Sequence, residues 1–348
     1  MIFESIEMSD ATENNTITAI PGIRVGHCED RAALRGVTVI RFPEEGAIAS
    51  VDVRGSAPGT RETDLLDPMA TVERIHAIVL AGGSAYGLDA ASEVMACLED
   101  ENIGYRASAL DISIPIVPAA VIFDLFVGDP LIRPTREWGL HACRVASDAP
   151  VALGNVGAGL GATVGKTLGL ERRMKGGLGS FVMNLPGGIR VGALVIVNAF
   201  GDIMDPRTDK IIAGVRGEKK GQFADSIRLF LHNIGPATPQ RTNTTIGVVA
   251  TNARLSKIQL RKVAQMAHNG LARSIRPVHT IFDGDTIFAV SVPGRDIEGD
   301  PGRGLMMIAV AAGRVLEEAI RLAVAEAEMV AGIPAARDWE DVGAARQD

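Results

Sequence analysis

The residue best placed to do chemistry in this sequence is a threonine at the start of an apolar segment. Residues 244–253 are mostly small or β-branched and predict a buried strand, and the polar run before them ends at Asn243. A hydroxyl at the first position of a core strand has few structural uses. Its chemical use would be for Thr244 to cleave the chain before itself and then act as an N-terminal nucleophile. This hypothesis depends on which other reactive residues lie nearby.

Two carboxylates, Asp283 and Asp285, are the first candidates to assist Thr244. They stand two positions apart in a segment, 280–293, that alternates as a strand does, so both would lie on one face of it. Such a pair could share a proton or hold a cationic amine. Because Asp-Gly is also a common turn dipeptide, a hairpin turn at this point stays open.

Asn198 is the second candidate. It lies within the apolar run 191–200, and a buried Asn without hydrogen-bond partners costs about 1–3 kcal/mol. The amide would therefore be either a structural bridge or a donor for an oxyanion.

Lys166 follows a glycine-dense segment whose backbone can approach a ligand closely. Residues 161–167 resemble a phosphate-binding loop, but three residues separate the glycines where that motif requires four. Residues 157–161 lack the third glycine of a dinucleotide site. Neither cofactor is expected, and general burial statistics favour a solvated lysine on a flexible loop.

The elements that must position these residues follow from the pattern of apolar residues. A strand at 77–80 breaks at 81–87 and leads into a helix that continues through Leu98. A capping box at 256–259 begins a helix whose end is predicted at Gly270. A polar linker is expected over 204–243. Further strands are expected at 36–40, 47–54, 119–125 and 189–203 (the last as a hairpin or one long strand), with a long helix at 305–330. These blocks indicate layered sheets covered by helices.

The composition is that of an ordinary globular protein. The 348 residues are 47% hydrophobic and 22% charged, and 39 glycines with 4% aromatic residues indicate a core of aliphatic side chains. A net charge of −7 argues against nucleic acid as the main partner.

The sequence also gives no support for a metal site, a disulfide framework or a membrane-spanning segment. The three cysteines are widely spaced, and the histidines lack the spacing of metal ligands. The first 20 residues do not resemble a signal peptide. The apolar run 305–312 is much shorter than the roughly 20 residues that span a bilayer. We therefore expect a cytoplasmic protein with no metal, no cofactor and no membrane partner.

At these residues the sequence resembles the DmpA-type family of self-cleaving N-terminal-nucleophile aminopeptidases, which includes β-aminopeptidases and nylon-oligomer hydrolases. The resemblance runs from about Ile17 to Val330. Its motifs stand in order along the chain: PGIRVGH at 21–27, DVRGSAPGTRET at 52–63, LAGGSAYGL at 80–88, VGK at 164–166, Asn198, NTT at 243–245 and DGDT at 283–286.

The resemblance implies an α+β fold, an αββα sandwich of two packed sheets covered by helices. It implies a polar leader (1–16) and one catalytic domain cut into an α chain (17–243) and a β chain (244–348), assembled as a homo-oligomer of αβ heterodimers. It implies Thr244 as nucleophile and Asn198 as oxyanion donor, with the remaining site residues around them: Lys166, Asp283 and Asp285 at the centre, and Gly82, Gly83, Ser84, Tyr86 and Phe123 toward the substrate.

Three departures from the family pattern leave the substrate open. Many members have Ser as nucleophile, many aminopeptidases carry Ser-x-Glu in place of Asp283-x-Asp285, and a Tyr found in some members falls near Phe123. L-Aminoacyl peptides, D-amino acid amides or esters, β-peptides and ω-amino amides all fit. Two other functions stay open: an acyl transferase similar to ornithine acetyltransferase, and an uncleaved binding or scaffold protein.

Overall fold

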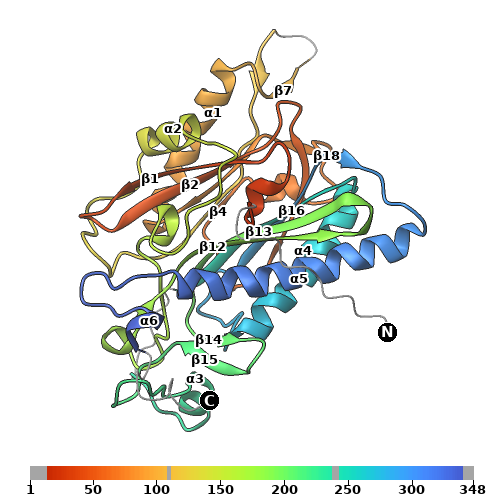
Figure 1. Cartoon of the computed structure of the whole chain (residues 1–348). Coiled ribbons are helices and arrows are strands. Elements are labelled where there is room, and N and C mark those ends of the chain that lie inside the picture. The colour runs from red at the N-terminus through yellow and green to blue at the C-terminus, as the bar shows by residue number, and fades with distance from the viewer. Residues whose placement is uncertain (1–13, 108–110, 237–242, 340–348) are drawn as a thin grey trace.

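Four layers make up the molecule: two β-sheets packed face to face, each covered on its outer side by a pair of helices (Figure 1). This computed structural model describes residues 14–107, 111–236 and 243–339. The αββα sandwich and the α+β class predicted from the sequence are confirmed.

Within the described chain, one inner sheet has five strands and the other has six. The five-stranded sheet has the order β1 (Arg24–Asp30), β2 (Arg35–Arg41), β6 (Ala77–Ala81), β9 (Ala119–Val121) and β4 (Thr60–Arg61). The six-stranded sheet has the order β12 (Gly177–Leu185), β13 (Ile189–Asn198), β16 (Thr244–Ala253), β18 (Thr286–Arg295), β3 (Ala47–Val53) and β5 (Arg74–Ile75).

The outer layers are helical. Helices α1 (Ala90–Asp100) and α2 (Arg136–Arg144) cover the five-stranded sheet, and α4 (Lys257–Ser274) and α5 (Pro301–Ala325) cover the other. The smaller elements are β7 (Tyr105–Arg106), β8 (Ser113–Ile114), β10 (Thr163–Val164), β11 (Met174–Lys175), β14 (Asp202–Asp205), β15 (Lys210–Ala213), β17 (Ile275–Arg276), α3 (Ser226–Leu231), α6 (Ala336–Trp339) and 3-10 helices at Ile17–Ala19, Asp64–Leu66, Ser84–Asp89, Gly157–Gly159, Leu170–Arg172 and Pro186–Gly188.

Alternate residues of the central strands enter different cores. On β13, Val195 and Val197 pack against α4 and α5, whereas Leu194 and Ile196 pack between the two sheets. Because both faces of such a strand are buried, its sequence is apolar throughout rather than alternating. This is why the sequence of β16 looked like one continuous core strand, and the same alternation decides which way the side chains at the strand ends point.

The predicted end of α4 at Gly270 is wrong, although the helix begins at the predicted capping box on Ser256. The helix continues to Ser274. A β-carbon at Gly270 would lie 2.4 Å from the carbonyl oxygen of Gly313 on α5. Gly270 therefore allows the two covering helices to approach each other closely, and it does not end a helix.

Two further segments differ from the sequence-based expectation. The strand predicted over 189–203 ends at Asn198, and the chain then enters β14 of a separate three-stranded sheet. The expected linker 204–243 contains β15 and α3, while residues 237–242 lie outside the described residues.

The start of the chain is only partly described, because residues 1–13 of the predicted leader lie outside the described residues. Thr16, assigned to that leader, is buried, and its hydroxyl accepts a hydrogen bond from the backbone N–H of Val151 at 3.1 Å. Its last residues are therefore part of the packed domain. Among the described helices, none is long and apolar enough to cross a membrane.

Candidate active site

Thr244 and Asn198 face each other at the ends of two neighbouring strands. They are register partners in the antiparallel pair of β13 and β16, and both are buried. Each shares the alternation of residues that pack between the two sheets, so both side chains point toward the five-stranded sheet. The Thr244 hydroxyl donates a hydrogen bond to the Asn243 carbonyl, directly before it in the chain. The nucleophile predicted from the sequence is therefore in contact with the bond it is predicted to cleave.

The side chain of Asn198 connects three parts of the fold. Its Oδ1 accepts hydrogen bonds from Lys166 Nζ at 2.9 Å and from the Thr163 N–H at 3.0 Å. Its Nδ2 donates to the carbonyl oxygen of Phe123, at the end of the opposite sheet, at 2.9 Å. The structure thus shows the bridging role that the sequence left open, and the amide is held in a fixed orientation next to Thr244.

Lys166 is buried, with 6% of its surface exposed, so the expectation of a solvated lysine is wrong. Its backbone N–H donates to the Phe200 carbonyl, just beyond β13, and its Nζ reaches both the side-chain and main-chain oxygens of Asn198. Burial lowers the pKa of this amine to about 7, opposed by the charge of Asp283. Near neutral pH the amine is therefore poised between its charged and neutral forms.

The two aspartates lie in the loop before β18, so the prediction that they share one face of a strand is wrong. Asp283 Oδ2 accepts from the backbone N–H and the hydroxyl of Thr280, at 2.8 and 2.6 Å. Burial, followed by the charge of Asp285, raises the pKa of Asp283 to about 6. Asp285 Oδ1 instead accepts from the backbone N–H of Thr245 at 2.7 Å. The loop, unlike a strand, gives the two carboxylates different partners while keeping both beside the start of β16.

Sequence reasoning missed two residues of this loop. His279 pairs through Nδ1 with Asp285 Oδ2 at 2.8 Å, and its own backbone N–H also donates to that oxygen. The backbone N–H of Gly284 donates to the Asn243 carbonyl oxygen at 3.0 Å. No motif in the sequence around His279 marks it as a site residue, and a backbone N–H donor cannot be recognised from the type of its residue. The only signal was the position of Gly284 between the two aspartates.

The glycine-rich loop predicted to bind substrate surrounds a carboxylate of the protein itself. The Gly83 N–H donates to Asp124 Oδ1 at 2.7 Å, and a β-carbon at Gly82 would lie 2.4 Å from Asp124 Oδ2. The Ser84 N–H donates to the Ile122 carbonyl, just beyond β9, and Tyr86 is exposed, with the guanidinium of Arg133 3.9 Å from its ring centre. Gly82 therefore leaves room for the Asp124 carboxylate, which a larger residue would displace. None of the four predicted residues has a described hydrogen bond to Thr244.

Phe123 contributes through its main chain. Its carbonyl accepts from Asn198, and its ring lies 5.4 Å from that of Phe126. The residue after it is the fully buried Asp124. The contact between Asp124 and the glycine loop therefore fixes the segment that holds the Asn198 amide.

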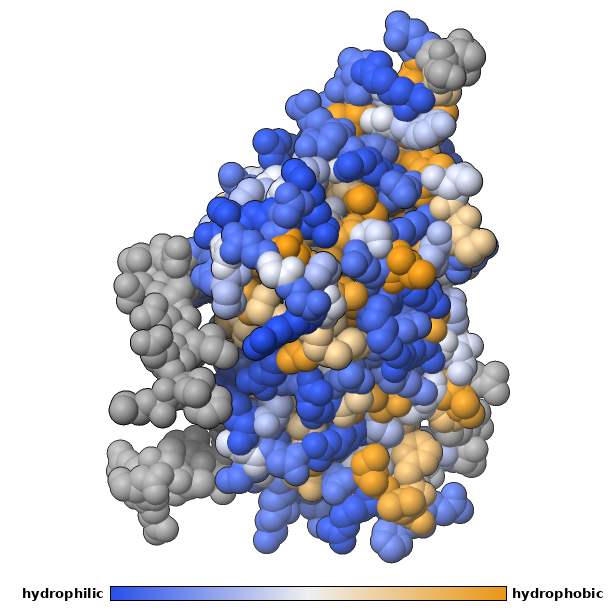
Figure 2. Space-filling view, turned by 90° about the vertical axis from the view of Figure 1, so that its right-hand side faces the viewer, coloured by the Kyte–Doolittle hydropathy of each residue, from blue (hydrophilic) through white to orange (hydrophobic). Residues whose placement is uncertain are grey.

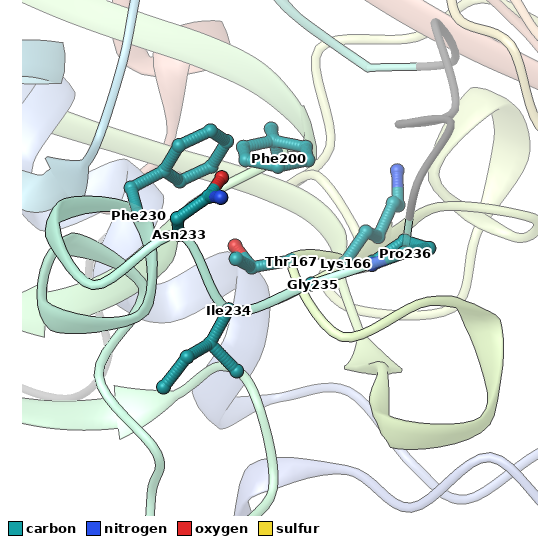
Figure 3. Close-up of a pocket in the computed structure, with 8 residues that line it drawn as sticks. All are labelled: Lys166, Thr167, Phe200, Phe230, Asn233, Ile234, Gly235 and Pro236. Carbon is teal, nitrogen blue, oxygen red and sulfur yellow. The ribbon is translucent and has the colours of Figure 1, made fainter.

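A pocket of about 380 Å³ opens beside Lys166. The rings of Phe200 and Phe230 lie on one side of it and Lys166 on the other, as Figure 3 shows, and no acidic residue is among its described lining. Phe200 also lies 6.0 Å from the ring of Phe282, which precedes Asp283. The pocket, lined by Lys166, Thr167, Phe200, Phe230, Asn233, Ile234, Gly235 and Pro236, is therefore next to the residues around Thr244.

Lys175 offers a test of how burial acts on amines near the site. Its buried Nζ donates to the carbonyls of Leu160 and Ala162, and burial lowers its pKa to about 7, against the charge of Asp124. An unfolded lysine keeps its proton up to about pH 10.4, so above about pH 7 the unfolded state binds more protons and stability rises with pH. Lys175→Met should remove part of this rise. In urea titrations, the free energy of unfolding should increase less between about pH 7 and pH 9.5 in the variant than in the wild type, and equal increases would contradict the assignment.

No group of three or more His, Cys, Asp or Glu side chains that could hold a metal occurs among the residues described. The arrangement around Thr244 is a hydroxyl, an amide, an amine and two carboxylates, supplied by the ends of β13 and β16, the segment after β10 and the loop before β18. Such a set can support nucleophilic attack on a carbonyl without a metal.

Comparison with known proteins gives consistent results. The pattern of peptidase family S58 matches residues 15–337. An uncharacterized aminopeptidase of Mycobacterium leprae is 43% identical, over 93% of this chain and 94% of its own. A 6-aminohexanoate-oligomer endohydrolase of Kocuria sp. is 34% identical, over 88% and 84%. The solved structure of the L-aminopeptidase D-Ala-esterase/amidase of Ochrobactrum anthropi, described as a variant of the Ntn hydrolase fold, matches with a TM-score of 0.65 at 22% identity, over 92% of this chain and 88% of that one.

Proposed function

The chain belongs to peptidase family S58 and is a hydrolase of the aminopeptidase and amidase kind, and on that premise we propose that it matures by cleaving itself before Thr244. The observation that carries the proposal is the contact between the Thr244 hydroxyl and the Asn243 carbonyl. A nucleophile held next to the carbonyl of its own peptide bond avoids much of the entropic cost of bringing the two groups together.

Maturation proceeds in two steps. Thr244 Oγ adds to the Asn243 carbonyl carbon, the Asn243–Thr244 amide bond breaks, and the hydroxyl proton passes to the departing nitrogen. Water then hydrolyses the ester: its oxygen gives Asn243 a carboxylate, one of its protons goes to Oγ, and the other is taken up by the new amine or by solvent. The product has a new α-amine at Thr244, whose ordinary pKa of about 7.7–8.0 suits a base near neutral pH.

Turnover uses the same hydroxyl. The Thr244 amine takes the proton from Oγ as it attacks a substrate amide or ester, the leaving amine or alcohol departs with a proton, and water hydrolyses the acyl-enzyme. Asn198 stabilises the oxyanion. An amide nitrogen carries two hydrogens, so the bond from Nδ2 to Phe123 is compatible with a second donation.

The charged residues orient these groups. Lys166 holds Asn198 through Oδ1, and Asp285 accepts from the backbone N–H of Thr245, the residue directly after the nucleophile in β16. Asp283, with its pKa raised to about 6, is positioned to accept or return a proton or to hold a substrate ammonium.

The substrates we propose are small peptides, amino-acid amides or the corresponding esters. The relatives named above act, by their names, as an aminopeptidase and as an endohydrolase of 6-aminohexanoate oligomers, and both names describe cleavage of an amide bond. The pocket beside Lys166 has an aromatic wall that suits the aliphatic part of such a substrate. Gly82, Gly83, Ser84, Tyr86 and Phe123 remain the proposed outer contacts, and the mature form is proposed to be a homo-oligomer of αβ heterodimers in the cytoplasm.

The proposal is tested first by the intact mass of freshly purified protein under denaturing conditions. Cleavage before Thr244 would release residues 244–348, which by proportion of length are about 11 kDa of the 36.6 kDa chain. We expect this species, beginning with Thr, together with its larger partner. A single 36.6 kDa species after long incubation would overturn self-processing and favour the scaffold alternative.

The reaction type is tested on the processed protein. Amino-acid p-nitroanilides and a 6-aminohexanoate dimer should yield free acid and amine. Formation of an acylated amine when a second amine is added, with little free acid, would instead indicate an acyl transferase.

A further inference from the structure

The carbonyl oxygen of Asn243 has a main-chain hydrogen-bond donor on it. In the continuous chain, the Gly284 N–H donates to this oxygen at 3.0 Å, while the Thr244 hydroxyl contacts the same group. A donor that stabilises an oxyanion must lie about 2.7–3.1 Å from the place where the negative charge develops. In self-cleavage that place is the Asn243 oxygen.

The Gly284 amide is held rigidly by hydrogen bonds on both of its neighbours. The carbonyl of Asp283 accepts from the Ala57 N–H at 2.9 Å, and the carbonyl of Asp285 accepts from the Arg54 and Gly55 N–H groups at 2.9 and 3.2 Å. The carbonyl of Gly284 itself accepts from the Thr286 hydroxyl at 3.0 Å. These bonds tie the loop to the segment after β3, so the donor needs no reorganisation when charge appears.

The loop also approaches the nucleophile so closely that only glycine fits. A β-carbon at position 284 would lie 2.6 Å from the Ala57 carbonyl oxygen and 3.0 Å from Thr244 Oγ1. Any side chain would push the N–H away from Asn243 or displace the hydroxyl. The close approach therefore serves the contact with the scissile bond.

The other proposed donor has a described bond elsewhere. Asn198 Nδ2 donates to Phe123 at 2.9 Å, and its Oδ1 is held by Lys166. The described donors to the Asn243 carbonyl oxygen are the Gly284 N–H and the Thr244 hydroxyl, and the hydroxyl is consumed as the nucleophile.

Resting on the self-cleavage proposed above, we infer that the backbone N–H of Gly284 is the oxyanion donor of the maturation step. As Thr244 Oγ adds to the Asn243 carbon, the carbonyl π electrons move onto oxygen, and Gly284 stabilises that charge. Collapse restores the carbonyl, breaks the bond to the Thr244 nitrogen, and leaves the ester. An active site defined by side chains alone would therefore leave out the Gly284 N–H, which takes part in the maturation step.

The test replaces one amide by an ester. Full-length protein carrying glycolic acid at position 284 keeps the shape of glycine and lacks only the N–H. The rate of appearance of the 244–348 fragment, followed by intact mass, should fall by about 100-fold, the size of effect seen when one oxyanion donor is removed. The matched control carries glycolic acid at position 46, which removes the Gly46 N–H bonded to the Pro43 carbonyl at 2.8 Å in the turn before β3, and it should mature within a few-fold of wild type.

A second variant, Thr286→Val, tests the inference without unnatural residues. It removes the hydroxyl bonded to the Gly284 carbonyl, one of the bonds that hold the loop in place, and should slow maturation several-fold while the melting temperature shows a folded chain. If the glycolate chain does not fold, this variant decides alone. Maturation at the wild-type rate in the folded variants would overturn the inference while leaving self-cleavage intact, whereas a wild-type chain that never matures would remove the proposed function itself.

Discussion

Thr244→Ala is expected to yield a single uncut chain of 36.6 kDa with no hydrolysis of amide or ester substrates. The substitution removes the only hydroxyl that contacts the Asn243 carbonyl in the described chain, and without cleavage the α-amine proposed as the base never forms. Both reactions should therefore fall to background, as measured by intact mass and by release of p-nitroaniline.

Thr244→Ser is the matched control, because it keeps the hydroxyl and loses one methyl group. It should be cleaved at the same bond and retain turnover. An Ala variant that still separates into two chains at residue 244 would falsify the assignment of the nucleophile. An uncut Ala variant that still hydrolyses substrates would assign turnover to another group.

The layers of the fold and the pairing at the site were largely predictable, for one physical reason. Strands buried on both faces are apolar along their whole length, so the sequences of β13 and β16 indicated core strands with a polar residue at one end of each. Asn198 and Thr244 stand out because a polar group at such a position must have a partner. The resemblance to a family placed them in one site, and the strand register shows them as neighbours.

The errors came from groups whose role depends on distant parts of the chain. Lys166 was expected in solvent because its local sequence is glycine-rich, but the end of β13 and the residues around it bury it. Gly270 looked like a helix end because its partner, Gly313 on α5, is 43 residues away in sequence. Gly284 offered no side chain to interpret, and its function as a donor exists only where the loop meets Asn243. Local sequence patterns predict helices and strands, whereas the roles of these three residues depend on how those helices, strands and loops pack against one another.

Asn198→Ala is expected to lower turnover by about 10²–10³-fold, the effect of losing one oxyanion donor. The same change removes the acceptor for Lys166 Nζ and the Thr163 N–H and the donor to Phe123, so the free energy of unfolding should fall by about 1–3 kcal/mol. Turnover of p-nitroanilides by the matured fraction, and urea titration of the whole protein, measure the two effects separately. The kinetic loss should appear in kcat, since the donor acts when charge develops.

Asn252→Ala separates catalysis from structure. Asn252 is a buried asparagine at the other end of β16, and like Asn198 it bridges main-chain groups, accepting from the Arg190 N–H at 2.7 Å and donating to the Gly188 carbonyl at 3.1 Å. Its loss should cost a comparable amount of stability and leave kcat within a few-fold. If Asn198→Ala behaved in the same way, losing stability but keeping kcat, its amide would be a structural bridge alone. The oxyanion of turnover would then have to be stabilised by other donors, with the Gly284 N–H the first to examine, since it contacts the carbonyl that Thr244 Oγ is proposed to attack in maturation.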